Sequence, residues 1–350
     1  MNRRTSLFRR LCHSPVLRGA GVALVMVVAP ACISLAQTND KGVGVQDDAT
    51  TALQSACDGG DAKSCNQLGD MYFGGTGVQK DEARAAQLLQ KACEGDYAEG
   101  CLGLGAMYFG GTGVQKDDVR AVELFQKSCD GGNAKGCDLL AVMYYAGKGV
   151  QKDYVRAVQL YQKACDGGAA EGCEDIALMY YKGLGVQQDE VRAVQLFQKS
   201  CDGGYAEGCY NLGVMYDKGT AVQQDEARAV QLYQKTCDGA YAKGCVALGD
   251  MYYAGKGVQK DDVRAFQLDQ KACDAGDAEG CAELGAMYLD GDGVQKDEAR
   301  AVQLLHKACD GGDAEGCHTL GLAYEKGVGV RKDKKKAKEY SDKARALTSQ

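Results

Sequence analysis

The sequence of 350 residues contains no tryptophan and only two prolines, Pro15 and Pro30, which both lie near the N-terminus. Proline removes a backbone N–H and clashes with the preceding helical turn. Its absence from the rest of the chain therefore leaves that part free to form one helix after another. Histidine is also scarce, with three residues in all, and this limits the metal sites that the chain can complete.

The first 36 residues predict an export signal. They carry five arginines and no acid, followed by an apolar run from Val22 to Ala29 that is too short to span a bilayer and by small residues suited to cleavage after Ala36. We therefore expect a periplasmic or secreted protein. The alternative is a lipoprotein anchored at Cys32, since the residues before this cysteine distantly resemble a lipobox.

The charge of the exported chain is strongly negative. Cleavage after Ala36 removes five arginines, so the formal charge changes from −7 to −12. An acidic surface argues against nucleic acid or an anionic membrane as the main partner. No segment after the signal predicts a membrane span, and we expect a monomer.

Cysteine reveals an internal repeat. After the leader, sixteen cysteines form eight pairs; the two members of a pair are eight positions apart, and successive pairs are 36 positions apart. The pairs are Cys57 and Cys65, Cys93 and Cys101, Cys129 and Cys137, Cys165 and Cys173, Cys201 and Cys209, Cys237 and Cys245, Cys273 and Cys281, and Cys309 and Cys317. An even number of cysteines in an exported protein favours disulfides.

Each repeat predicts two helices. The first segment, residues 62–73 in the first repeat, is named helix A, and its apolar stripe comprises Cys65, Leu68, Gly69 and Tyr72. After a glycine-rich loop, Asp81 is placed to cap a second segment, residues 82–93, named helix B. The apolar stripe of helix B comprises Ala85, Leu88, Leu89 and Ala92.

Two helices of about a dozen residues cannot bury both stripes alone, so neighbouring repeats must stack. We therefore predict an all-α fold: an α-solenoid of stacked antiparallel helix pairs with one disulfide per repeat, forming a curved superhelix. The predicted organisation comprises a signal peptide (1–36), a partial repeat with a short helix B (37–60), tandem repeats (61–332) and a basic capping helix (333–350), in which Arg345 replaces the expected cysteine.

The repeat resembles the Sel1-like family, which is related to tetratricopeptide repeats. The resemblance rests on the pattern Leu-Gly-x-Met-Tyr-x-x-Gly-x-Gly-Val-Gln-Lys-Asp, as at Leu104 to Asp117, and on the ending Gln-Lys-Ala-Cys of helix B. The cysteine pairs are similar to those of its cysteine-rich branch, the Helicobacter cysteine-rich proteins. That branch implies a disulfide between paired helices, and its members include penicillin-binding proteins and weak β-lactamases.

A structural role suits the cysteines best. Zinc sites use closer cysteines and further ligands, and only His306 and His318 follow the leader. Redox centres use Cys-x-x-Cys, which is absent. Cysteines eight apart on one straight helix lie about 12 Å apart, beyond disulfide reach, but a tight turn between two helices brings them together. We therefore expect disulfides, no metal and no cofactor.

The sequence contains no standard catalytic constellation. After the leader, serine occurs only at Ser55, Ser64, Ser128, Ser200, Ser341 and Ser349. None of these begins a Ser-x-x-Lys motif, and no Lys-Thr-Gly follows. We expect no catalytic residues and no enzyme. A β-lactamase-like hydrolase or β-lactam-binding protein remains the alternative that the resemblance implies.

The variable positions of helix A are the candidate binding site. The positions of Asn66, Asp70 and Phe73 lie beside the core stripe, and their contents change from repeat to repeat. The resemblance implies that A helices line the concave face. We expect this stripe to bind an extended peptide or a protein, or alternatively an envelope glycan. The predicted contact residues are Asp70, Phe73, Phe109, Tyr145, Tyr181, Tyr210, Asp250 and Tyr253. A second interpretation is that these side chains only cover the seam between repeats.

Overall fold

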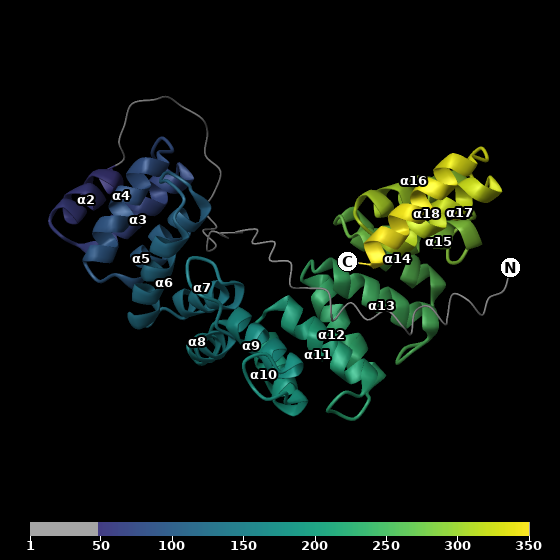
Figure 1. Ribbon diagram of the computed structural model, residues 1–350, viewed down its shortest axis with the longest axis horizontal. Helices are drawn as coiled ribbons and strands as arrows, with labels where there is room; N and C mark the ends of the chain where they lie inside the picture. The colour runs from purple at the N-terminus through teal and green to yellow at the C-terminus, as the bar shows by residue number, and fades with distance from the viewer. Residues whose placement is uncertain (1–47, 350) are drawn as a thin grey trace. The chain divides into compact units, whose positions relative to one another are not determined.

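The computed structural model describes residues 48–349, which contain seventeen helices and no strand (Figure 1). The predicted signal peptide, Cys32 and the first part of the partial repeat lie outside this range. Among the described helices, none combines the length and the apolar character needed to cross a membrane. The predicted all-α solenoid is confirmed, whereas the proposed domain boundaries stay predictions.

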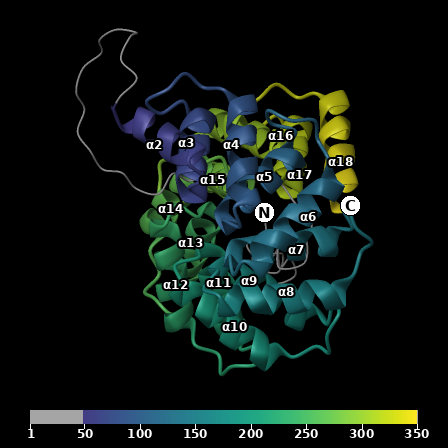
Figure 2. The same cartoon turned by 90° about the vertical axis from the view of Figure 1, so that its left-hand side faces the viewer.

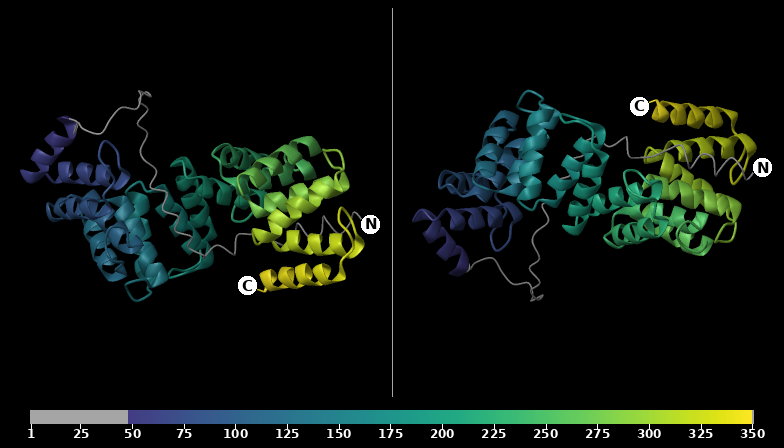
Figure 3. Two further views of the ribbon diagram at one scale, coloured as in Figure 1. Left: turned by 90° about the horizontal axis from the view of Figure 1, so that it is seen from above. Right: turned by 90° about the horizontal axis from the view of Figure 1, so that it is seen from below.

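The helices alternate between two kinds along the chain, as Figures 2 and 3 show from three further directions. The A helices are α3 (Ala62–Gly74), α5 (Ala98–Gly110), α7 (Ala134–Ala146), α9 (Ala170–Lys182), α11 (Ala206–Lys218), α13 (Ala242–Ala254), α15 (Ala278–Asp290) and α17 (Ala314–Lys326). The B helices are α2 (Asp48–Asp58), α4 (Glu82–Glu94), α6 (Asp118–Asp130), α8 (Tyr154–Asp166), α10 (Glu190–Asp202), α12 (Glu226–Asp238), α14 (Asp262–Asp274), α16 (Glu298–Asp310) and α18 (Lys334–Thr348).

The loop between the two helices of a repeat is set by its end residues. Gly75 follows α3 with φ of 73°, and its N–H donates to the Met71 carbonyl at 2.8 Å. This left-handed conformation ends the helix and favours glycine. Asp81 then accepts a hydrogen bond from the Arg84 N–H at 2.9 Å and caps α4. Both devices recur along the array, which explains why the loops are alike.

The core is formed by the stripes that the sequence predicted. In the first repeat, Leu68 and Ala85 are fully buried, and every other member of the two stripes is also buried. The glycine of the A stripe permits close packing of A against B: a Cβ on Gly105 would lie 2.7 Å from the Phe125 ring. Burial of this stripe in each repeat supplies the main stabilising term.

Eight disulfides connect the B helix of one repeat to the A helix of the next. They join the sixteen cysteines in the predicted order, with Cα–Cα distances between 4.4 and 4.6 Å. The first bridge therefore links α2 to α3, and the last links α16 to α17. Each bridge thus links two neighbouring units of a stack in which a repeat contacts only its neighbours.

The A helices form the inner layer of the stack. Each A helix packs on its own B helix, and most A helices also contact the A helix of the next repeat, as α7 does on α9 and α9 on α11. Consecutive repeats contact each other mainly through the B helix of one repeat and the A helix of the next, and to a smaller extent through their A helices. Side chains on this layer from successive repeats lie near enough to form one surface, which is the surface expected to carry the binding site.

Candidate functional site

Most aromatic residues of the predicted binding stripe are half-buried. Phe73, Phe109, Tyr145, Tyr181 and Tyr253 all lie near the C-terminal end of an A helix and retain part of their surface exposed. Rings in this state can contribute apolar contact area to a partner while the A–B core fixes their position.

Some of these rings also contact the next repeat. Tyr253 on α13 donates a hydrogen bond to Asp292 Oδ2 at 2.8 Å, across to the loop that follows α15. The Phe109 ring has Lys148 Nζ of the next repeat 5.2 Å from its centroid. These two residues therefore cover the seam, as the second interpretation expected. A half-exposed ring can contact the next repeat with one side and still offer its exposed side to a partner.

The remaining stripe residues differ in exposure. Asp70 is exposed and accepts a hydrogen bond from Asn66 Nδ2 at 3.0 Å, and Asp250 is half-buried. Tyr210 is buried, with 9% of its surface exposed, because its ring packs between Tyr233 and Tyr241 at centroid distances of 5.7 and 5.6 Å. Tyr210 thus offers little surface to a partner.

The structure also brings together acids that the sequence-based site did not include. We name them the carboxyl cluster: Asp138 on α7, Glu171, Glu174 and Asp175 on α9, and Glu207 on α11. Asp138 and Glu174 occupy the variable position of Asn66 in two consecutive repeats, where both are buried, with 8% and 5% of their surface exposed. The sequence analysis missed this cluster; the signal that could have found it is two acids at one repeat position, with a third directly after the second.

Few side chains of the described residues donate hydrogen bonds to these carboxyl groups. Asn211 Nδ2 on α11 donates to Glu174 Oε1 at 2.9 Å, and the Tyr205 hydroxyl donates to Glu207 Oε2 at 3.4 Å. Asp138 Oδ1 is buried and has no hydrogen-bond partner among residues 48–349. A buried carboxylate oxygen without a donor is unfavourable by about 1–3 kcal/mol.

The environment raises the pKa of three members of the cluster. Burial raises the pKa of Asp138 to about 7; Glu171 adds to the increase and Lys135 opposes it. Burial and Glu207 raise the pKa of Glu174 to about 8, against the effects of Lys182 and Asn211. Burial and the nearby Asp138 hold the pKa of Asp175 well above its usual range. Buried, perturbed carboxyl groups gathered on one surface identify a candidate functional site.

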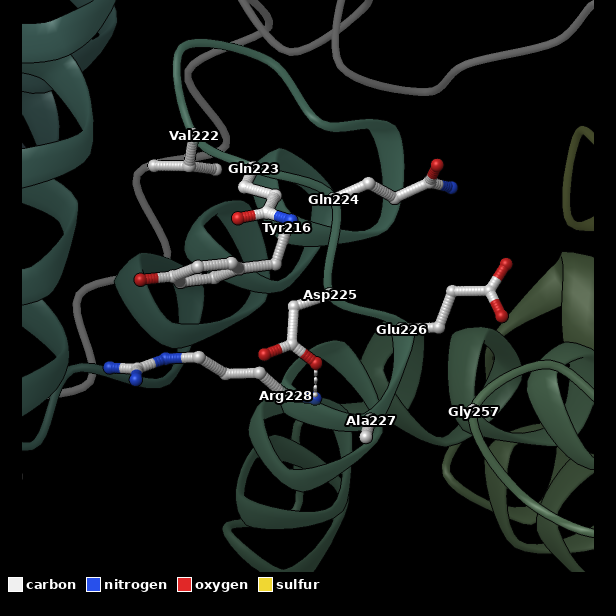
Figure 4. A pocket seen from close by; sticks show the side chains of 9 residues that line it. All are labelled: Tyr216, Val222, Gln223, Gln224, Asp225, Glu226, Ala227, Arg228 and Gly257. Atoms are coloured by element: carbon white, nitrogen blue, oxygen red, sulfur yellow. Dashed lines mark hydrogen bonds between the residues drawn. The ribbon is translucent and has the colours of Figure 1, made fainter.

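A separate hollow of about 850 Å³ lies on the loop side of the array, lined by Tyr216, Val222, Gln223, Gln224, Asp225, Glu226, Ala227, Arg228 and Gly257 (Figure 4). Its polar groups have structural partners. Asp225 caps α12 through the Arg228 N–H at 2.9 Å, and the Arg228 guanidinium lies 4.8 Å from the Tyr216 ring centroid. Asp81, Arg84 and Tyr72 repeat this arrangement in the first repeat, so the hollow follows from the scaffold.

The serines show no catalytic arrangement in the described part of the chain. Ser64 donates to the Asp61 carboxylate, and Ser200 and Ser341 donate to backbone carbonyls, both at 2.8 Å. Within residues 48–349, no serine hydroxyl is hydrogen-bonded to a histidine or lysine side chain, and no three His, Cys, Asp or Glu side chains are placed to hold a metal ion.

Comparison with known proteins gives relatives for this arrangement. The chain matches a protective antigen of uropathogenic Escherichia coli that has an SLR fold, with 29% identity, a TM-score of 0.72 and coverage of 85% of this chain. This chain spans 64% of that protein. It also matches a Sel1 repeat protein from Oxalobacter formigenes, with 25% identity, a TM-score of 0.65 and coverage of 89% of this chain and 94% of that one.

Helicobacter pylori cysteine-rich protein B matches with 34% identity over 38% of this chain and 96% of that one, with a TM-score of 0.32. A search of curated proteins finds no match. The family model described as Sel1 repeat matches eight consecutive segments: 62–97, 98–133, 134–168, 170–205, 206–241, 242–277, 278–313 and 314–349. The last segment includes α18, the helix that the sequence predicted to be a basic cap. The chain therefore belongs to the Sel1 repeat family.

Proposed function

We propose that this protein is an exported scaffold that binds a protein or peptide partner along its inner layer of A helices. It is a disulfide-linked Sel1 repeat array, and Sel1 repeats mediate protein interactions. The observation that carries the proposal is the row of half-buried aromatic rings on the A helices, at positions whose residues change between repeats. Stacking of the repeats requires the same residues at the same positions of every repeat. Recognition of one partner requires a particular set of side chains that differ between repeats.

Export is part of the proposal. Eight disulfides indicate an oxidising environment, because thiols in the cytosol are kept reduced. The arginine-rich N-terminal segment supports release into the periplasm or the medium after cleavage near Ala36. N-terminal sequencing of the exported protein tests this. A lipid-modified N-terminal Cys32 would instead identify a lipoprotein.

Binding along the inner layer is tested by photo-crosslinking in the producing cells. A crosslinking residue at Tyr181 should capture a partner, whereas one at Val191, which is 57% exposed on a B helix, should not. The triple variant Tyr145→Ala, Tyr181→Ala and Tyr253→Ala should lose the partner while keeping its helical content in circular dichroism.

The chain offers a matched control for that variant. Val119, Val155 and Val191 are also apolar and exposed, but they lie on B helices. Their joint replacement by Ala should leave partner binding unchanged. Loss of binding in the control, or its persistence in the tyrosine variant, would place the binding surface elsewhere.

The alternative function, β-lactam binding or hydrolysis, has no supporting contact among the described serines. A direct experiment tests it. Covalent labelling by a fluorescent penicillin, or turnover of a chromogenic cephalosporin, would support it. Neither is expected from a binding scaffold.

A further inference from the structure

The carboxyl cluster lies within the inner layer, at its middle. It is carried by α7, α9 and α11, which are consecutive A helices, with α9 in contact with both α7 and α11 (Figure 1). No other repeats place two buried acids at the Asn66 position: the equivalent residues are Asn66, Leu102, Tyr210, Val246, Ala282 and His318. The cluster is therefore a feature of this place in the array.

The carboxylate oxygen Oδ1 of Asp138 has no hydrogen-bond donor among residues 48–349. A Cβ on Gly172, in the first turn of α9, would lie 3.2 Å from Asp138 Oδ1, so the carboxylate lies against this turn and next to Glu171. Its surroundings thus add negative charge instead of a donor. Only 8% of the Asp138 surface is exposed, and Oδ1 has no hydrogen-bond partner among the described residues. A donor from another molecule would supply the hydrogen bond that this buried oxygen lacks.

The chemistry of the site selects the kind of donor. Five acids face only two nearby lysines, Lys135 and Lys182, and neither forms an ion pair with a cluster carboxylate among the described contacts. The acids are not arranged as metal ligands within residues 48–349. Tyrosines border the cluster: Tyr205 bonds to Glu207, and burial together with Glu207 shifts the pKa of Tyr241 upward. Carboxylates beside aromatic rings are complementary to an ammonium or guanidinium group.

We propose that the partner of the inner layer is a peptide segment with a lysine or arginine side chain that enters the carboxyl cluster between α7 and α11 and donates to Asp138. This inference rests on the proposed function, and it adds the chemical class of the partner. The aromatic rings of Tyr145 and Tyr181, on α7 and α9, would then hold the apolar residues that flank the cation.

The proposal predicts that binding releases protons. The titratable and charged groups that face Asp138, Glu174 and Asp175 are Glu171, Glu207, Lys135, Lys182, Tyr161 and Tyr205. Burial raises the pKa of Asp138 to about 7 and that of Glu174 to about 8, so the free protein keeps protons there near neutral pH. A cation favours the ionised carboxylates and displaces these protons. Affinity should therefore increase as the pH rises from about 6 to about 8.5.

The test measures binding of a fluorescein-labelled hexa-arginine peptide to the purified full chain by fluorescence anisotropy. Asp138→Asn with Glu174→Gln should weaken binding at pH 8.5 by at least about tenfold. The same variant should reduce the pH dependence, because only Asp175 then keeps a raised pKa in the cluster. The glutamine can still accept the hydrogen bond from Asn211, so the fold should be retained and circular dichroism checks it.

The control removes the same formal charge elsewhere. Asp96 and Glu123 are exposed and lie outside the cluster, and Asp96→Asn suits the positive φ of 58° at this position. Asp96→Asn with Glu123→Gln should change the affinity by less than about twofold. Equal losses in both double variants would show non-specific attraction to an acidic protein and overturn the inference.

The partner captured at Tyr181 separates this inference from the proposed function. Loss of that partner in the tyrosine variant but its retention in Asp138→Asn with Glu174→Gln would overturn the cationic partner alone. Retention in both variants would overturn both proposals. Loss in both, with binding intact in the Asp96 and Glu123 control, is the expected result.

Discussion

The two layers of the array, the B helices and the A helices, differ in how much their residues change from one repeat to the next. The B layer and its links repeat closely: an aspartate caps every B helix from α4 to α18, and a disulfide lies at the C-terminal end of every B helix from α2 to α16. The inner face of the A layer changes at the same repeat position from Asn66 to Asp138 to Tyr210. Residues that serve stacking thus recur along the array, whereas the residues that we propose for recognition differ from repeat to repeat.

The largest expected effect is on the links between repeats. Each bridge closes a short loop and contributes about 2.5 kcal/mol by the loop-closure model, so full reduction should lower stability by several times this amount. We expect loss of helical signal at a much lower urea concentration with dithiothreitol than without it. The mass of the unreduced protein should show no free thiols among the sixteen cysteines after the leader. Identical urea transitions with and without reductant would contradict a stabilising role.

The next effect concerns the interface shared by A and B helices. Gly105→Ala places a methyl group 2.7 Å from the Phe125 ring and should destabilise the protein by up to about 3 kcal/mol in urea denaturation. Gly74→Ala is the matched control, since the added Cβ would meet only Thr76 Oγ1, at 3.4 Å. Because the interface recurs, Gly213→Ala against Tyr233 should behave like Gly105→Ala. A tolerated Gly105→Ala would show that the layers can move apart.

The next prediction concerns the pH dependence of stability, which depends on the carboxyl cluster of the A layer and not on the residues that recur in every repeat. Asp138 and Glu174 have pKa values raised by burial to about 7 and about 8, so the folded state binds protons more tightly than the unfolded state. Their contribution to stability is present below the unfolded pKa near 4 and is lost as the pH rises through about 7 to 8. Stability should therefore fall from pH 5 to pH 8.5, and urea denaturation at the two pH values measures the fall. Asp138→Asn with Glu174→Gln should reduce this fall, whereas an unchanged slope would show that other groups cause it.

The smallest effect tests a single cap in the shared layer. Asp153 accepts from the Arg156 N–H at 2.9 Å and caps α8, so Asp153→Ala should cost about 1 kcal/mol in thermal or urea unfolding. Asp202 is the control, because it lies at the C-terminal end of α10, where a negative charge is unfavourable. Asp202→Ala should be neutral or slightly stabilising. Equal losses for both aspartates would exclude capping as the reason for the repeated residue.

The sequence predicted the helices closely. Residues 62–73 and 82–93 were expected to be helical, and α3 and α4 each extend one residue further, to Gly74 and Glu94. The stripe with Leu68 and the stripe with Leu89 are both buried. These predictions succeeded because helical periodicity, capping residues and glycine-rich loops act over a few residues and recur in every repeat.

The candidate site was predicted less completely. The sequence identified the stripe of Tyr145 and Tyr181 but could not show that Tyr210, at another position of this stripe, is covered by Tyr233 and Tyr241. It also could not group Asp138 with Asp175 and Glu207, which come from three different helices. Exposure at these positions depends on side chains one repeat away.

The sequence by itself therefore determined the period, the helix pairs and the order of the disulfides, since local pattern and cysteine spacing specify them. Only the tertiary structure decided which variable side chains are covered and which acids share one environment. Stacking brings residues about 36 positions apart in sequence into contact, and the loss of water there changes the pKa of Asp138 and Glu174. That change arises from burial among neighbours, which no single repeat contains.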